Sequence, residues 1–200
     1  MAEEIINELV EMNNLLIIIS ILLGCQTMSA QEMKDVFSAM PDSVLPTLTR
    51  NNRLDMVDFV TSGMRAEVKD VFDETVTLDT LTADYLHLTL SDALKVEMKL
   101  LPSSVVLSDS TTKAVCMVMT YGKRPFESRI QMFTSNWNPL PLPAYLSDGN
   151  VAHLSPSDTT LSLQKVELVE YREEGEEKST KDEEIPLTTL KWDGNTFNKD

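Results

Sequence analysis

The chain has 200 residues, with 17 lysines and arginines against 32 aspartates and glutamates, and its formal net charge is −15. A surface of that sign repels nucleic-acid phosphates and anionic lipid headgroups, which argues against nucleic-acid binding and against electrostatic attachment to a membrane. The length suits one domain with a self-sufficient core.

An apolar run near the start of the chain has the length of a signal-peptide core. Residues 15–23 have the sequence LLIIISILL, far short of the roughly twenty apolar residues that span a bilayer. Residues 1–11 contain acids and no lysine or arginine, unlike the positive start of a signal peptide, so we expect translation to begin at Met12. We therefore predict a signal peptide over residues 1–30 and a mature protein without a transmembrane span.

Two processing sites compete at the end of this leader. Leu22-Leu23-Gly24-Cys25 resembles the lipobox of bacterial lipoproteins, in which Cys25 would be lipidated. Met28-Ser29-Ala30 resembles a signal peptidase I site and is slightly favoured. Both predict an exported protein of the periplasm, outer membrane or cell surface; the alternative is that the segment is a buried helix.

The folded part contains a single cysteine, because the other one lies in the leader. Cys116 occurs in the apolar run 114–121, and an internal disulfide needs a second cysteine. We predict that Cys116 is a small buried side chain without a catalytic role.

Two or three short helices are expected before the first strand. Apolar residues at 33, 36, 37 and 40 have helical spacing, and Pro41 ends that pattern. Residues 49–52 offer N-cap side chains for a second helix through residue 62, which Gly63 would end. A third helix is considered over 65–72. The expected buried stripe consists of Met33, Phe37, Leu54 and Val57.

Beyond residue 74 the apolar period falls to two, which predicts strands. Residues 85–90 and 94–100 form a hairpin with one solvated face, and 113–121 is apolar on both faces, as in a central strand. A return strand covers 128–132. Three prolines between 139 and 143 argue against a ladder there.

In the C-terminal part, two predicted strand regions flank an acidic segment. A strand is expected at 160–171, and Asp193-Gly194 predicts a closing hairpin of 187–192 and 196–198. Residues 172–184 hold seven acids and no apolar residue before position 185, so we predict a mobile acidic loop. The result is an α+β fold: one domain over 31–200, with the helices packed on a mainly antiparallel sheet of about seven to eight strands.

Most catalytic chemistries lack their residue patterns here. The six glycines are too widely spaced for a phosphate-binding loop, and His87 and His153 are the only histidines. We expect His87 on a strand surface and His153 in a loop, and we predict no cofactor and no metal site. No G-x-S-x-G motif is present, and the many acids alone neither identify nor exclude a carboxylate pair.

Residues 137–143 form the candidate contact segment, because consecutive prolines present apolar surface that is already ordered. The leading hypothesis is a non-catalytic envelope domain that binds a protein or a glycan. The alternative is a carboxylate-based hydrolase acting on envelope glycans. The aromatics Trp137, Tyr145 and Trp192 could stack on sugars, although large rings are more often core residues. The candidate binding residues are Trp137, Pro139, Leu140, Pro141 and Tyr145.

Five short motifs point to one family. They are MPDS at 40–43, NNRLDMVDF at 51–59, TADYL at 82–86, MKLL at 98–101 and WNPLP at 137–141. With them, most of the mature chain resembles domain of unknown function 3256, an uncharacterised family of exported proteins from gut Gram-negative bacteria. The resemblance implies an envelope location and no particular mechanism. The acidic residues before Met12 depart from the family pattern, which supports the later start.

Overall fold

The computed structural model of the chain describes residues 32–123, 127–146, 150–171, 179–184 and 188–199, and for 166–171 and 179–184 it describes the backbone alone. The unit Glu32–Asp200 is compact. The predicted leader, the start at Met12 and the lipidation of Cys25 fall outside the described residues. Within these residues, none of the helices has the length and apolar character needed to cross a lipid bilayer.

Two helices begin the described chain, as predicted. Helix α2 spans Met33–Ser38 and α3 spans Arg50–Thr61. Thr49 caps α3 reciprocally: its Oγ1 accepts from the Asn52 N–H (3.3 Å), and the Asn52 Oδ1 accepts from the Thr49 N–H (3.1 Å). Gly63 ends the helix with a φ of 70°, in the region that favours glycine.

The buried face of α3 is shifted by one position in the sequence from the predicted stripe. Arg53 and Met56 are fully buried, whereas Leu54 and Val57 are half-buried. The prediction of a third helix over 65–72 is wrong, because strand β1, Glu67–Lys69, lies there and pairs with β2. After the turn at Gly63, pairing with a sheet edge satisfies the backbone of this segment, so its apolar spacing does not decide its conformation.

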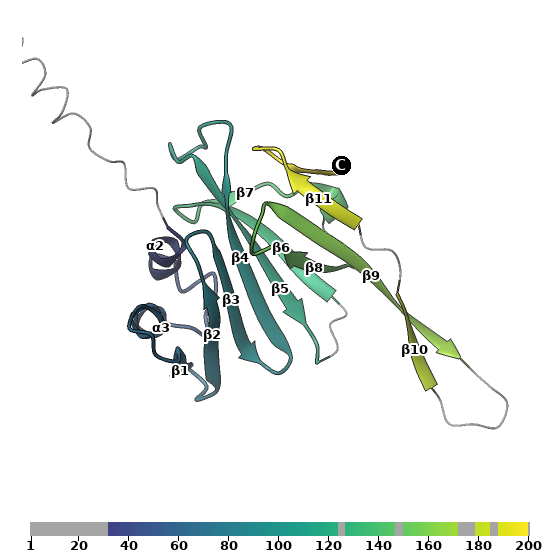
Figure 1. Cartoon of the computed structure of the whole chain (residues 1–200), viewed down its shortest axis with the longest axis horizontal. Coiled ribbons are helices and arrows are strands. Elements are labelled where there is room, and N and C mark those ends of the chain that lie inside the picture. The colour runs from purple at the N-terminus through teal and green to yellow at the C-terminus, as the bar shows by residue number, and fades with distance from the viewer. Residues whose placement is uncertain (1–31, 124–126, 147–149, 172–178, 185–187, 200) are drawn as a thin grey trace, which may run out of the picture. The chain divides into compact units, whose positions relative to one another are not determined.

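The first sheet is an antiparallel meander in which seven strands follow one another in chain order (Figure 1). The proline segment contributes a short edge strand, which corrects the prediction that no ladder forms there; Pro139 and Leu140 pair with β6, and an edge position tolerates the missing N–H. After β1 the strands are β2 Thr75–Leu81, β3 Tyr85–Ser91, β4 Leu94–Pro102, β5 Lys113–Tyr121, β6 Glu127–Thr134 and β7 Pro139–Leu140.

The second sheet is built around the long strand β9, Thr160–Tyr171. Strands β8 (Asn150–Leu154) and β11 (Thr188–Trp192) pair with the first half of β9, residues 160–165, and β10 (Ser179–Glu184) pairs with residues 166–171. Strand β12 (Phe197–Lys199) pairs with β11, which confirms the predicted closing hairpin. The 3-10 turn η1 (Ala144–Leu146) follows β7 in the chain and precedes β8.

Part of the predicted acidic loop is a strand. Residues Ser179–Glu184 pair with Val166–Tyr171 in regular antiparallel register, so the loop prediction is wrong for these six residues. Backbone hydrogen bonds with β9 can form whatever the charge of the side chains, which is why composition alone does not identify the strand. Residues 172–178 of the predicted loop lie outside the described residues.

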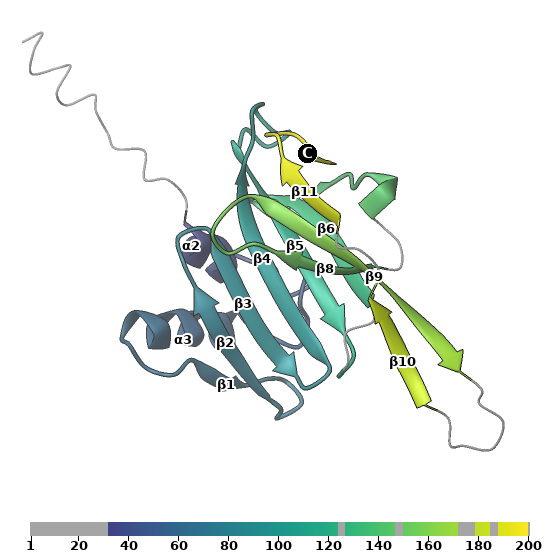
Figure 2. The ribbon, with the colours of Figure 1, turned by 45° about the vertical axis from the view of Figure 1, so that its right-hand side comes forward.

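Two apolar cores lie on opposite faces of the first sheet. The helices cover one face, and the second sheet covers part of the other (Figure 2). Central strand β5 supplies both: Val115 and Met117 face the helices, while Ala114, Cys116 and Val118 face the second sheet. The predicted double-faced strand is therefore confirmed, and so is the buried, free Cys116.

The α+β fold class is confirmed: two N-terminal helices pack on antiparallel strands. The predicted single sheet of about seven to eight strands matches the first sheet, whereas the second sheet adds five more strands within the described residues. The face of the β3–β4 hairpin that was predicted to be solvated is partly covered by this second sheet, and Tyr85 and Lys99 are buried there.

Candidate functional site

Two cavities open where the segment after β7 meets the C-terminal hairpin. Both are bounded by Phe197 of β12 and by residues on or next to η1. We call them the Lys199 cavity and the Trp192 cavity. Because segments about fifty residues apart in sequence build each one, neither is visible as a sequence motif.

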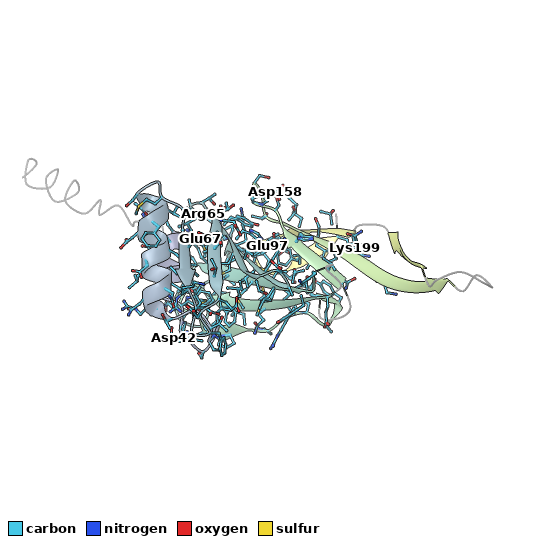
Figure 3. The ribbon with its side chains drawn as sticks, turned by 90° about the horizontal axis from the view of Figure 1, so that it is seen from below. Asp42, Arg65, Glu67, Glu97, Asp158 and Lys199 are labelled. Carbon is cyan, nitrogen blue, oxygen red and sulfur yellow. The ribbon has the colours of Figure 1, made fainter. Side chains whose placement is uncertain are left out.

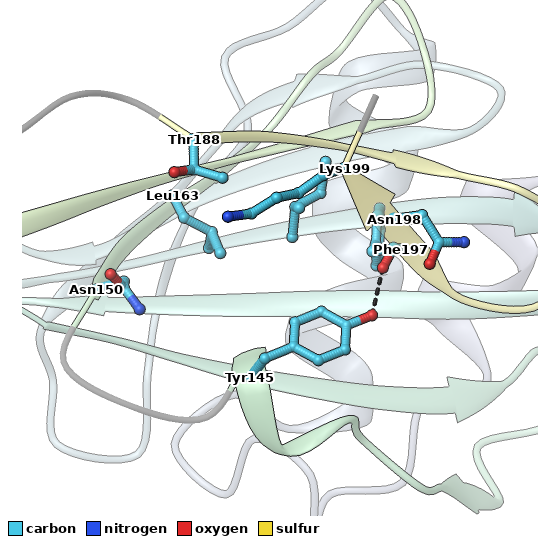
Figure 4. Close-up of a pocket in the computed structure, with 8 residues that line it drawn as sticks. Tyr145, Asn150, Leu163, Thr188, Phe197, Asn198 and Lys199 are labelled. Atoms are coloured by element: carbon cyan, nitrogen blue, oxygen red, sulfur yellow. Dashed lines mark hydrogen bonds between the residues drawn. The ribbon is translucent and has the colours of Figure 1, made fainter.

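The Lys199 cavity has a volume of about 440 Å³, in the range typical of small-ligand sites. Its apolar lining consists of Leu163, Leu190 and Phe197. Polar groups come from Tyr145, Asn150, Thr188, Asn198 and Lys199 (Figure 4). Asn198 Nδ2 donates to Asp193 Oδ2 (2.7 Å), and its side chain points away from Leu163 in Figure 4, so Asn198 borders the cavity chiefly through its backbone.

The Trp192 cavity is smaller, about 320 Å³, and most of its lining residues are apolar. Its lining residues are Met132, Pro141, Leu142, Pro143, Leu146, Trp192, Asn195, Thr196 and Phe197. The Trp192 ring lies edge-on to Phe197, with ring centroids 5.2 Å apart, and its Nε1 donates to Pro102 O (2.6 Å). These two contacts hold the Trp192 ring in a fixed orientation at the cavity wall.

Tyr145 borders the Lys199 cavity from η1. Its hydroxyl donates to Phe197 O and lies 3.2 Å from Thr196 Oγ1, so the ring is anchored on the C-terminal hairpin. The residue is nevertheless 54% exposed. Tyr145 therefore presents a fixed aromatic face to solvent, which suits a contact residue.

The β4–β5 loop extends the same end of the molecule. Ser104 N donates to Gly194 O (2.8 Å), which places the loop against the turn of the C-terminal hairpin. Val105 and Val106 in this loop are 52% and 69% exposed. With Tyr145 they make up three of the six large apolar side chains that are exposed among the described residues. Exposed apolar groups gathered at one end mark a candidate interaction surface.

Charged and polar side chains meet at a different place, between β3, β4 and β8. Lys99, 1% exposed, pairs with Asp84 Oδ2 (2.9 Å) and donates to Pro156 O (3.0 Å). The Tyr85 hydroxyl donates to Glu97 Oε1 (2.9 Å), and Glu97 Oε2 accepts from the Leu154 N–H (3.3 Å). Burial and the adjacent Glu97 carboxylate raise the pKa of Tyr85. These groups bond one another and the edge of β8, so the cluster connects the two sheets.

The catalytic groups considered in the sequence are not gathered at either cavity. Among the described lining residues, neither cavity contains an aspartate or a glutamate. Burial raises the pKa of the Cys116 thiol, which keeps it protonated. Within the described ranges, no group of three or more His, Cys, Asp or Glu side chains could hold a metal ion.

Comparison with known proteins decides the family. The model described as "Protein of unknown function (DUF3256)" matches residues 25–180. The chain belongs to this family. The match spans all five motifs on which the predicted resemblance depends, and that prediction is confirmed.

A solved structure, "Structure of a domain of an uncharacterized protein from Porphyromonas gingivalis W83", is similar to this DUF3256 chain, with a TM-score of 0.59 and 21% identity. The similarity covers 86% of this chain and 98% of that one. At that identity it shows a shared fold alone. No curated protein matches the chain.

Trp137 is the predicted binding residue that the structure places elsewhere in this DUF3256 chain. It is 6% exposed, its Nε1 donates to Val36 O of α2 (2.8 Å), and its ring packs against Phe133. The residue belongs to the core cluster on the helical face of the first sheet. The interpretation of Trp137 as a contact is therefore wrong, and the three aromatics form no common platform.

The other predicted binding residues lie near the cavities. Pro141 lines the Trp192 cavity and Tyr145 lines the Lys199 cavity, while Pro139 and the half-buried Leu140 form β7. No pattern in the sequence predicted that Asn150, Thr188 and Lys199 would line a cavity. A polar residue of an ordinary strand carries no signal in the sequence, because only the pairing of β8, β9, β11 and β12 brings these three together.

His153 lies in β8 and not in a loop, and its pH behaviour follows from its neighbour. Its Nδ1 is 3.5 Å from Glu97 Oε2, and hydrogen bonding and attraction to Glu97 raise its pKa despite burial and Lys95. A raised pKa stabilises the fold fully below the unfolded value of about 6.5, and this contribution is lost as pH rises through the folded pKa.

We expect NMR titration of the His153 imidazole to give a midpoint above about 6.5, and a midpoint closer to that value in the Glu97→Gln variant. A His87→Gln variant assigns the two histidine signals. An unchanged His153 midpoint in Glu97→Gln would contradict the assignment to Glu97.

Proposed function

We propose that this DUF3256 protein is exported and acts in the bacterial envelope as a non-catalytic domain that binds a protein or glycan partner. The leader-like residues 15–23 support export. The observation that carries the binding function is the surface formed by the Trp192 cavity, Tyr145 and the exposed Val105 and Val106. We call this the loop-end surface.

The composition of the loop-end surface fits recognition better than catalysis. Prolines 141 and 143 and the anchored rings of Trp192 and Tyr145 present apolar area that loses little conformational entropy on binding. Asn195 and Thr196 add amide and hydroxyl groups at the rim. An apolar centre with hydrogen-bonding groups around it is typical of protein interfaces and also suits glycan rings.

The hydrolase alternative requires two carboxyl groups facing one cavity. The described lining of both cavities contains none. Glu97 and Asp84 are instead bonded to Tyr85 and Lys99 in the cluster between the sheets. We therefore do not propose the hydrolase function.

Photo-crosslinking in cells tests the proposed function. A photoreactive amino acid at position 141 or 145 of the full chain should yield a defined crosslinked species in the envelope fraction. The matched control is position 55, exposed on α3 across the first sheet from the second sheet. Protease or glycosidase sensitivity of the adduct then separates a protein partner from a glycan. Equal adduct patterns at 55 and 145, or no adduct at 141 and 145, would refute the proposal.

A further inference from the structure

The Lys199 cavity combines an apolar floor with one positive charge. Leu163, Leu190 and Phe197 are 7%, 2% and 1% exposed, so the floor is fixed by the packing of the second core. Lys199 lies at the end of β12, and Figure 4 shows its side chain directed over the cavity toward the side of Leu163. Among the described lining residues it is the only charged one.

The charge of Lys199 is not neutralised by the described part of the chain. The ion pairs there involve other lysines and arginines, and no described carboxylate is paired with Lys199. Acids outnumber bases by 32 to 17 in the whole chain. Figure 3 places Lys199 on the side of the second sheet, away from the labelled ionic groups Asp42, Arg65 and Glu67. The described lining of the cavity therefore carries one positive charge and no negative charge.

The polar groups near Lys199 are hydrogen-bond donors that can also serve an anion. Thr188 contributes a hydroxyl, and Asn150 contributes an amide from the strand on the other side of β9. The backbone adds one more donor. Trp192 N donates to Thr159 O and therefore points away from β12, and backbone N–H directions alternate along an antiparallel ladder in which Lys191 lies opposite Asn198. The backbone N–H of Lys199 consequently points away from β11, to the outer edge of β12.

We infer that the Lys199 cavity is a binding site for a small amphipathic carboxylate. The apolar chain of the ligand lies on Leu163, Leu190 and Phe197, and its carboxylate pairs with the Lys199 ammonium group. This site goes beyond the proposed function, because it takes a free small molecule and does not require a macromolecular partner at the loop-end surface.

One series of carboxylates and two single ligands, measured by isothermal titration calorimetry on the full chain, test the apolar and the ionic parts separately. From hexanoate to octanoate to decanoate, affinity should rise about fourfold for each added methylene while the chain still finds apolar floor. Acetate should not bind measurably, since it lacks the chain. Octanol should bind about two- to fivefold more weakly than octanoate, since it lacks the charge.

Variants then assign the charge to Lys199. Lys199→Met should remove the preference for octanoate over octanol, and Lys199→Arg should restore it. The matched control is Lys191→Met on the neighbouring strand, because Lys191 alternates with Leu190 and faces the other side of the sheet. That variant should retain the preference.

Either of two results would overturn the inference. One is affinity that does not depend on chain length, and the other is an equal effect of Lys199→Met and Lys191→Met. Both are independent of crosslinking at positions 141 and 145. A crosslinked partner without octanoate binding therefore refutes the carboxylate site and leaves the proposed function standing.

Discussion

Replacing Arg53 by methionine is expected to lower the free energy of unfolding by about 2–4 kcal/mol. The guanidinium group is fully buried in α3, where Nη1 donates to Leu48 O (2.5 Å) and Nη2 donates to Met40 O. Methionine fills a similar volume but donates nothing, so two buried carbonyl groups lose their partner. The methionine avoids the desolvation of a charge, which offsets part of this loss.

The exposed partner of Arg53 supplies the control. Asp42 Oδ1 lies 2.9 Å from Nη1, but its side chain is 62% exposed. Asp42→Asn should therefore cost no more than about 1 kcal/mol, as for ordinary surface ion pairs. Urea denaturation followed by circular dichroism measures both variants. If Asp42→Asn were as damaging as Arg53→Met, the ion pair and not the carbonyl bonds would hold the α2–α3 connection.

Apolar patterns predicted four strands of the first sheet. Val96 and Met98 alternate with polar residues, and the apolar run 113–121 faces both cores, so β3 to β6 could be derived from the sequence, whereas β1 and β7 could not. Arg53 shows where that reasoning fails. An arginine within a polar run such as 50–53 indicates a solvated face, yet its guanidinium donates to Leu48 O and Met40 O of the segment before α3, a role that depends on tertiary structure.

The candidate site was only partly predictable for the same reason. Pro141 and Tyr145 stood out by composition, whereas Lys199 and Thr188 gain their position from the pairing of β9 with β11 and β12. Trp137 was misplaced because its ring packs on Phe133 and its Nε1 donates to Val36 O, about a hundred residues away in the sequence. Composition does not encode such long-range contacts.

Replacing Glu97 by alanine is expected to loosen the second sheet from the first and to cost about 2–4 kcal/mol. One carboxylate accepts from the buried Tyr85 hydroxyl and from the Leu154 N–H at the edge of β8. Ser128 Oγ makes a second such contact by accepting from the Ala152 N–H (2.9 Å). Removing Glu97 leaves the Tyr85 hydroxyl and the Leu154 N–H without this acceptor, while the Ser128 contact remains.

Hydrogen exchange distinguishes a loss of contact between the two sheets from a destabilisation of the whole fold. In Glu97→Ala the exchange rate of the Leu154 amide should rise more than the exchange rates of amides in β2. Strand β2 serves as the reference because it lies two strands away from β4 in the first sheet. Glu97→Gln retains an acceptor oxygen and should cost about 1 kcal/mol. Glu67→Ala, which removes a surface carboxylate paired with Arg65, should leave the Leu154 amide unchanged. Equal acceleration at β2 and β8 in Glu97→Ala would show that Glu97 stabilises the whole fold and does not specifically join its two sheets.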